Sequence, residues 1–167
     1  MSRRGVGAHT IAAMKTVVQR VSRASVRVDG EIVGEIGRGV LALVGVERGD
    51  GPADAEATAR KLAGLRLFPN PDDERKPIDT SLLEIGGAAL VISQFTLAGD
   101  LRKGRRPSFN RAEDPALAEP LYLAVVEALR AAGVEAQTGR FGAKMQVELV
   151  NEGPVTLLIF SQGGVIQ

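Results

Sequence analysis

Cysteine is absent from this 167-residue chain, which excludes disulfides, thiolate nucleophiles and cysteine-ligated zinc. The same absence fits a reducing compartment, and we expect a cytoplasmic protein. Histidine occurs once, as His9, in an N-terminal stretch rich in glycine, alanine and arginine. If that stretch lies outside the folded domain, the domain has no Ser-His-Asp or Cys-His unit and no histidine-ligated zinc. We therefore expect neither a metal nor another cofactor.

Long apolar runs and a strong net charge are also missing. No run reaches the roughly 20 apolar residues of a membrane-spanning helix, and residues 1–13 do not resemble a signal peptide, so we expect no membrane association. The net charge of +1 gives no general attraction to nucleic acid. Such binding would need a local patch, and Arg102, Lys103, Arg105 and Arg106 crowd one loop. A cluster of this kind is usually a solvated loop, although it can contact phosphates.

The apolar residues indicate one domain with many strands. Hydrophobic residues make up 44% of the chain and charged residues 25%, as in ordinary globular proteins. We expect residues 1–13 to form a disordered extension and residues 14–167 a single domain. Alternating or continuous apolar runs predict strands over 15–28, 31–36, 40–46, 65–68, 88–94, 134–138, 145–150 and 155–160.

Two helices are predicted from their start signals. Pro52 and Pro115 each follow a capping residue, and Gly133 would end the second helix, whose apolar face would include Leu117, Leu121, Val125 and Leu129. Many strands with only two helices predict an α+β fold. We expect antiparallel-rich β-sheets that form a barrel-like core, with the two main helices packed on it.

The segment Asn151-Glu152-Gly153-Pro154-Val155-Thr156 lies between the last two predicted strands. A proline between strands indicates a turn or an edge, so the hexapeptide alone favours an ordinary hairpin turn. A bond that precedes proline can also be cis, at a cost of about 0.5–1 kcal/mol. A cis bond would turn the carbonyls of Gly153 and Pro154 to one side of the chain.

The segment Ser93-Gln94-Phe95-Thr96 directly follows a predicted buried strand. On its own it is best explained as a strand that ends in polar residues, with Phe95 in the core. Thr96 would need a base to act as a nucleophile, and Lys103 is the only lysine close in sequence. Phe141 is likewise more often a core residue than a stacking platform.

Several segments together resemble the D-aminoacyl-tRNA deacylase family, from Met14 to about Phe160. The Ser-Gln-Phe-Thr and Gly-Pro-Val-Thr segments correspond to the two signature motifs of that family. The matching segments are Met14-Lys15-Thr16-Val17-Val18-Gln19-Arg20-Val21, Ser93-Gln94-Phe95-Thr96-Leu97, Lys103-Gly104-Arg105-Arg106-Pro107-Ser108-Phe109, Phe141-Gly142-Ala143-Lys144-Met145 and Asn151-Glu152-Gly153-Pro154-Val155-Thr156.

The resemblance implies an editing hydrolase that cleaves the ester between a D-amino acid and the 3′-terminal adenosine of tRNA. It also implies a homodimer in which Gly153-Pro154 of one subunit enters the active site of the other. The two carbonyls of this dipeptide would accept hydrogen bonds from the substrate's α-ammonium group, and the dipeptide would exclude an L-side chain. Arg20 would hold the dipeptide in place.

The resemblance further assigns the remaining site residues. The catalytic pocket around the ester would be formed by Ser93, Gln94, Phe95 and Thr96. The stretch that cups the adenine would include Phe141, Gly142 and Met145.

The scarcity of histidine and cysteine favours catalysis by positioning and oxyanion stabilisation. Main-chain N–H groups near Phe95 and Thr96 would hold the oxyanion, and a ribose 2′-hydroxyl or a water would complete proton transfer. A Thr96 nucleophile is the competing mechanism. Because glycine has no side chain to exclude, some cleavage of glycyl-tRNA is also expected. Two other functions stay open: a non-catalytic RNA-binding dimer that uses the loop 102–106, and a structural dimer in which Gly153-Pro154 is only a turn.

Overall fold

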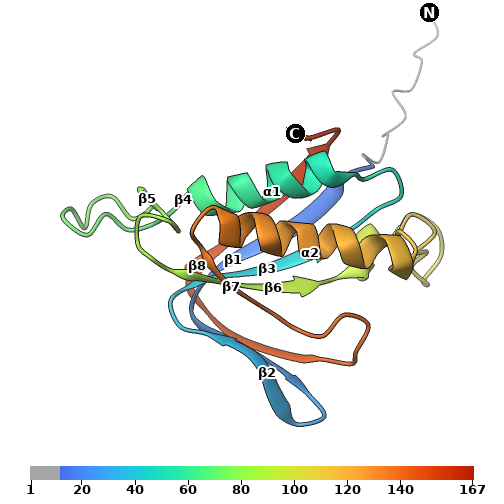
Figure 1. The fold of residues 1–167 in the computed structure, drawn as a ribbon, viewed down its shortest axis with the longest axis horizontal. Helices are drawn as coiled ribbons and strands as arrows, with labels where there is room; N and C mark the ends of the chain where they lie inside the picture. The colour runs from blue at the N-terminus through green and yellow to red at the C-terminus, as the bar shows by residue number, and fades with distance from the viewer. Residues whose placement is uncertain (1–11) are drawn as a thin grey trace, which may run out of the picture.

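The computed structural model describes residues 12–167, in which a curled β-sheet carries two helices on one face (Figure 1). The elements are β1 (Met14–Val28), β2 (Glu31–Ile36), β3 (Gly39–Gly45), α1 (Pro52–Gly64), β4 (Arg66–Phe68), β5 (Thr80–Ser81), β6 (Ala88–Ser93), a 3-10 turn η1 (Phe95–Ala98), α2 (Pro115–Ala131), β7 (Glu135–Thr138), β8 (Gln146–Gln162) and β9 (Val165–Ile166). The predicted α+β class and the two helices are therefore confirmed.

The main sheet has seven strands of mixed direction. Its order is β7-β6-β3-β1-β8-β9, and β2 also pairs with β1. The pairs that β1 makes with β2, β3 and β8 are antiparallel, whereas β3 with β6 and β6 with β7 are parallel. The parallel pairs arise because α1 and α2 are crossover connections that return the chain to the same end of the sheet. The expected antiparallel-rich sheet is thus only roughly right.

The sheet is buried on both faces at its centre. Val40, Ala42 and Val44 of β3 point into the core under the helices, whereas Leu41 belongs to a second apolar cluster with Leu90 and Ile92 of β6. This second cluster fills the inside of the curl, where β2 and the adjoining parts of β1 and β8 bend away from the helices (Figure 1). The continuous apolar run predicted for a strand buried on both faces is confirmed at β3.

The second helix buries a face that only partly overlaps the predicted one. Val125 and Leu129 are buried, but Leu117 is 58% exposed and Leu121 is only half-buried. The buried stripe is shifted by about one residue because α2 packs against α1 as well as against the sheet. The residues that form it are Ala118, Tyr122, Val125, Val126 and Leu129.

The strand β8 runs without interruption through Gly153-Pro154, so the predicted hairpin turn is wrong. Its partner β1 pairs Gln19 with Thr156 and then Val21 with Asn151, which leaves residues 152–155 opposite Arg20 alone. The segment is therefore a bulge within one long strand. The Gly153-Pro154 peptide bond is cis.

The N-terminal prediction stays largely untested because residues 1–11, including His9, lie outside the described part of the chain. Ala13, the last residue of the predicted extension, is buried, and its N–H donates to the Glu47 carboxylate at 3.4 Å. Across residues 12–167, no helix is both long and apolar enough to cross a membrane.

Candidate active site

A cavity of about 640 Å³ opens where β6 ends, beside the loop that follows β7. Its lining includes Ser93, Gln94 and Phe95 from the first of these segments. The second segment contributes three further predicted site residues, Phe141, Gly142 and Met145. The fold thus brings six of the predicted residues together, from two segments far apart in the sequence.

The strand pairing at the end of β6 places the Ser-Gln-Phe segment. Ser93 is the last residue of β6 to pair with β3, and the N–H of Gln94 donates to the carbonyl of Val44 at 2.8 Å. The chain then turns into η1, which begins at Phe95. Neither Phe95 N–H nor Thr96 N–H donates a hydrogen bond to any group of residues 12–167. Two main-chain N–H groups therefore have no partner among the described residues, and one of them belongs to Phe95, which lines the cavity.

Thr96 does not line the cavity, in contrast to the other three residues of its motif. It is exposed, and its hydroxyl accepts a hydrogen bond from the side-chain amide of Gln94. This contact holds the amide of Gln94, which does line the cavity. The arrangement gives Thr96 an orienting contact rather than a position in the cavity wall.

Aromatic rings stand at two sides of the cavity. Phe95 is 57% exposed, so the interpretation of Phe95 as a core residue is wrong. Its ring meets the edge of Phe109 at a centroid distance of 5.3 Å and an interplanar angle of 69°. Phe141 is half-buried, and the centroid of its ring lies 6.1 Å from the ring centroid of Tyr122. These rings give the cavity apolar surfaces on which a planar base can rest.

Several cavity residues were not predicted from the sequence. Phe109, Arg48, Glu113 and Asp114 all line it. Asp114 was recognised only as the residue that precedes α2, and Phe109 only as the end of a family segment. The signal that could have found them is the unusual length of the loop between η1 and α2, because long loops in compact domains are often functional.

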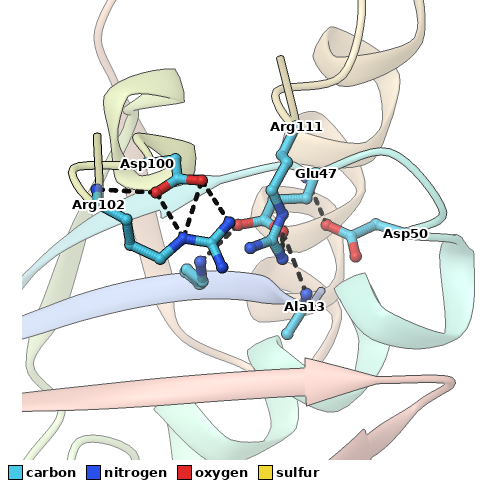
Figure 2. A network of polar contacts seen from close by, with 7 residues as sticks. Ala13, Glu47, Asp50, Asp100, Arg102 and Arg111 are labelled. Atoms are coloured by element: carbon cyan, nitrogen blue, oxygen red, sulfur yellow. Dashed lines mark hydrogen bonds and ion pairs between the residues drawn. The ribbon is translucent and has the colours of Figure 1, made fainter. Parts of the chain in front are cut away.

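The loop between η1 and α2 is anchored by the buried carboxylate of Glu47 (Figure 2). Glu47 is 1% exposed and binds Lys15 at 2.6 Å and Arg111 at 2.9 Å. Backbone bonds reinforce the anchor, since the N–H of Arg48 donates to the carbonyl of Arg111 at 2.9 Å. This wall of the cavity is therefore tied to β1 and to the end of β3.

A second ion pair closes the start of the same loop. Asp100 accepts from the side chain of Arg102 at 2.6 Å and from its N–H at 3.0 Å (Figure 2). These bonds from Arg102 hold the pKa of Asp100 well below its usual range. Arg102 is exposed and Asp100 is half-buried, so solvent weakens the pair, and its main role is to shape the loop.

Arg20, Gly153 and Pro154 form a separate cluster, and none of them lines the cavity. Arg20 is buried, and its Nε donates to the carbonyl of Glu152 at 2.8 Å. Its Nη1 donates to the carbonyls of Leu67 at 2.7 Å and Pro77 at 3.1 Å. Arg20 thus fixes the bulge of β8, while Gly153 and Pro154 are exposed to solvent. The structure unites these three residues but keeps them apart from the cavity of their own chain.

Comparison with known proteins decides the family. A family model described as D-Tyr-tRNA(Tyr) deacylase matches residues 17–160. The chain belongs to this family. A relative from Symbiobacterium thermophilum named D-aminoacyl-tRNA deacylase is 56% identical to it over 149 residues, which are 89% of this chain and 97% of the relative. A relative of the same name from Anaeromyxobacter dehalogenans is 54% identical over 149 residues, which are 89% of this chain and 98% of the relative.

Solved structures agree with the fold. The protein titled c-Myc DNA Unwinding Element Binding Protein superposes with a TM-score of 0.83 at 38% identity and covers 90% of this chain and 100% of its own. A probable eukaryotic D-amino acid tRNA deacylase superposes with a TM-score of 0.78 at 17% identity, covering 89% of this chain and 100% of its own, which supports the fold alone. The predicted family and the predicted enzyme class, a deacylase, are confirmed. All ten predicted site residues lie within the stretch that the family model matches.

Asp50, in the turn before α1, has a carboxyl group whose pKa is raised. Burial, together with the nearby carboxylates of Asp54 and Glu47, raises the pKa of Asp50 from 3.8 to about 7. One of its oxygens accepts from the N–H of Glu47 at 2.7 Å. Asp50 is therefore part of the polar network that surrounds the loop anchor (Figure 2).

We expect Asp50→Asn to stabilise the protein at pH 8 and to lose this advantage as the pH falls from 7 to 4. A raised pKa means that the folded state binds more protons than the unfolded state in this window, so wild-type stability falls as the pH rises through it. Asparagine can still accept from Glu47 but carries no charge. Urea unfolding at pH 8, 6 and 4.5 measures the difference, and an advantage that is equal at all three values would contradict the assignment.

Proposed function

We propose that this protein is a D-aminoacyl-tRNA deacylase, which hydrolyses the ester between a D-amino acid and the 3′-terminal adenosine of tRNA. The observation that carries the proposal is that one cavity, in a chain of this family, is lined both by Ser93, Gln94 and Phe95 and by Phe141, Gly142 and Met145. In it the ester lies beside Ser93, Gln94 and Phe95, and the adenine rests against Phe141, Gly142 and Met145. An aminoacyl-tRNA substrate places the activity in the cytoplasm.

The chemistry is hydrolysis of an activated ester. A water oxygen bonds to the ester carbonyl carbon, the bond from that carbon to the ribose 3′-oxygen breaks, and the 3′-oxygen takes up a proton. The main-chain N–H groups of Phe95 and Thr96 stabilise the oxyanion, which is supported by their lack of other acceptors in the described chain. The ribose 2′-hydroxyl or a water relays the proton, because no histidine or cysteine occurs within residues 12–167.

Selection for the D-configuration comes from Gly153 and Pro154 of a partner subunit. Two observations support an action in trans: both residues are exposed, and neither borders the cavity of its own chain. Their carbonyls accept from the α-ammonium group, which every aminoacyl ester shares, so one rigid element can serve many D-amino acids. The rigid dipeptide excludes an L-side chain sterically.

Exposed apolar side chains of β8 support the homodimer that this arrangement needs. Leu157 and Leu158 are 42% and 62% exposed on the strand that carries the dipeptide, and Val147 and Val150 are also exposed. Large apolar side chains left exposed in one subunit are candidates for burial at an interface. A two-fold contact along β8 brings each dipeptide to the other subunit.

The decisive assay compares the hydrolysis of D-tyrosyl-tRNA, L-tyrosyl-tRNA and glycyl-tRNA at equal concentrations. We expect rapid loss of the D-ester, some loss of the glycyl ester because it has no side chain to exclude, and no loss of the L-ester above the spontaneous rate. Binding of tRNA without turnover would instead support the non-catalytic RNA-binding dimer. Absence of both would leave a structural role.

We expect Thr96→Ala to keep substantial activity, within about tenfold of the wild-type kcat. The hydroxyl of Thr96 contacts Gln94 and does not line the cavity, so its removal loosens one hydrogen bond, worth about 1 kcal/mol. Single-turnover hydrolysis of D-tyrosyl-tRNA measures the effect. Complete loss of turnover with unchanged tRNA binding would favour Thr96 as a covalent nucleophile.

A further inference from the structure

The loop between η1 and α2 carries five cations, and only two of them have charged partners among the described residues. Arg102 is paired with Asp100 at 2.6 Å and Arg111 with Glu47 at 2.9 Å. The other three cations make no hydrogen bond or ion pair with any side chain of the described structure, and all are exposed: Lys103, Arg105 and Arg106. Their charges are therefore available to a ligand.

The loop is built to present these three side chains beside the cavity. Asp100 and Ser108 exchange backbone hydrogen bonds of 2.7 and 3.0 Å, so residues 101–107 project from a closed base. Gly104 at the tip has a φ of +65°, which favours glycine in this turn. Directly after the base comes Phe109, which lines the cavity and packs against Phe95. The base of the cationic loop thus adjoins the aromatic rim of the cavity.

We infer that Lys103, Arg105 and Arg106 bind the phosphates of the single-stranded nucleotides that precede the terminal adenosine of tRNA. This inference rests on the proposed function, because it takes the terminal adenosine to occupy the cavity. Sites for single-stranded nucleic acid combine unpaired cations that follow the backbone with aromatic surfaces for the bases. Both occur here, at one edge of the cavity. With a net charge of +1, the protein has no general field to hold tRNA, so a local patch must do so.

The role of the three cations is tested with one substrate that carries those phosphates and one that does not. The variant Lys103→Gln/Arg105→Gln/Arg106→Gln should lose at least about tenfold in kcat/KM for D-tyrosyl-tRNA. Its plot of log kcat/KM against log salt should become less steep by about 2, since each single-strand phosphate contact contributes about 0.7. Hydrolysis of 3′-O-D-tyrosyl-adenosine, which has no phosphate, should be unchanged, and this also shows that the variant is folded.

The matched control removes the same charge elsewhere. Arg60, Lys61 and Arg66 are exposed on α1 and β4, and none of them lines the cavity. The variant Arg60→Gln/Lys61→Gln/Arg66→Gln should keep the wild-type salt dependence on D-tyrosyl-tRNA. An equal effect of the two triple variants, or equal losses on tRNA and on D-tyrosyl-adenosine, would overturn the inference.

Failure of the proposed function is distinguishable from failure of this inference. If the wild-type protein hydrolyses neither substrate, the proposed function is wrong, and a titration with uncharged tRNA then decides the role of the loop. Weaker binding with a shallower salt dependence for the loop variant alone would still support phosphate contacts. Identical binding curves for wild type and loop variant would overturn them.

Discussion

Gly153→Ala is expected to lower kcat/KM for D-tyrosyl-tRNA by about 100-fold. Gly153 has a φ of +141°, which L-residues rarely adopt, and a Cβ there would lie 3.0 Å from Nη2 of Arg20 and 3.0 Å from Val155. Arg20 cannot retreat easily, because it is buried and its guanidinium donates to three carbonyls. The dipeptide must shift instead, and a displacement of about 1 Å in a positioning element can cost 10²-fold in rate.

The control for this variant is Gly30→Ala in the turn between β1 and β2. Gly30 also has a positive φ, +80°, but a Cβ there meets nothing within 4 Å. Both alanines therefore strain the backbone, and only the one at residue 153 disturbs Arg20 and the proposed selection element. Steady-state kinetics should show wild-type kcat/KM for Gly30→Ala. Comparable activity of the two variants would contradict the role of Gly153.

Glu47→Gln is expected to destabilise the fold by about 3 kcal/mol. The carboxylate of Glu47 is 1% exposed and neutralises Lys15 and Arg111, so its loss leaves two partly buried cations without a counter-charge. Breaking a buried pair from one side typically costs 3–5 kcal/mol. We take the lower end because Lys15 and Arg111 keep 18% and 24% exposure. The midpoint of urea unfolding at pH 7 and fixed protein concentration measures the loss.

An exposed ion pair supplies the comparison. Glu127 lies 2.8 Å from Arg130 on α2, with side chains 69% and 48% exposed. Glu127→Gln should change the free energy of unfolding by less than about 1 kcal/mol, because water solvates both charges. If Glu47→Gln were no more destabilising than Glu127→Gln, the anchor of the cavity loop would not contribute to stability.

The sequence predicted the parts of the fold that depend on local pattern. The apolar run of β3 identifies a strand buried on both faces, and Pro52 and Pro115 mark the first residues of α1 and α2. These signals are local because side-chain periodicity and the missing N–H of proline act within a few residues. The family resemblance added two motifs, and six of the residues that line the cavity were among those it assigned.

Contacts between distant segments were decided only by the tertiary structure. The path of β8 through Gly153-Pro154 depends on Arg20 of the neighbouring strand, which binds the carbonyl of Glu152 and allows a bulge where the hexapeptide alone favours a turn. The anchor at Glu47 requires Lys15 and Arg111, which come from different elements. A residue pattern cannot report such partners, because the stability of a buried charge depends on which groups surround it in space rather than in sequence.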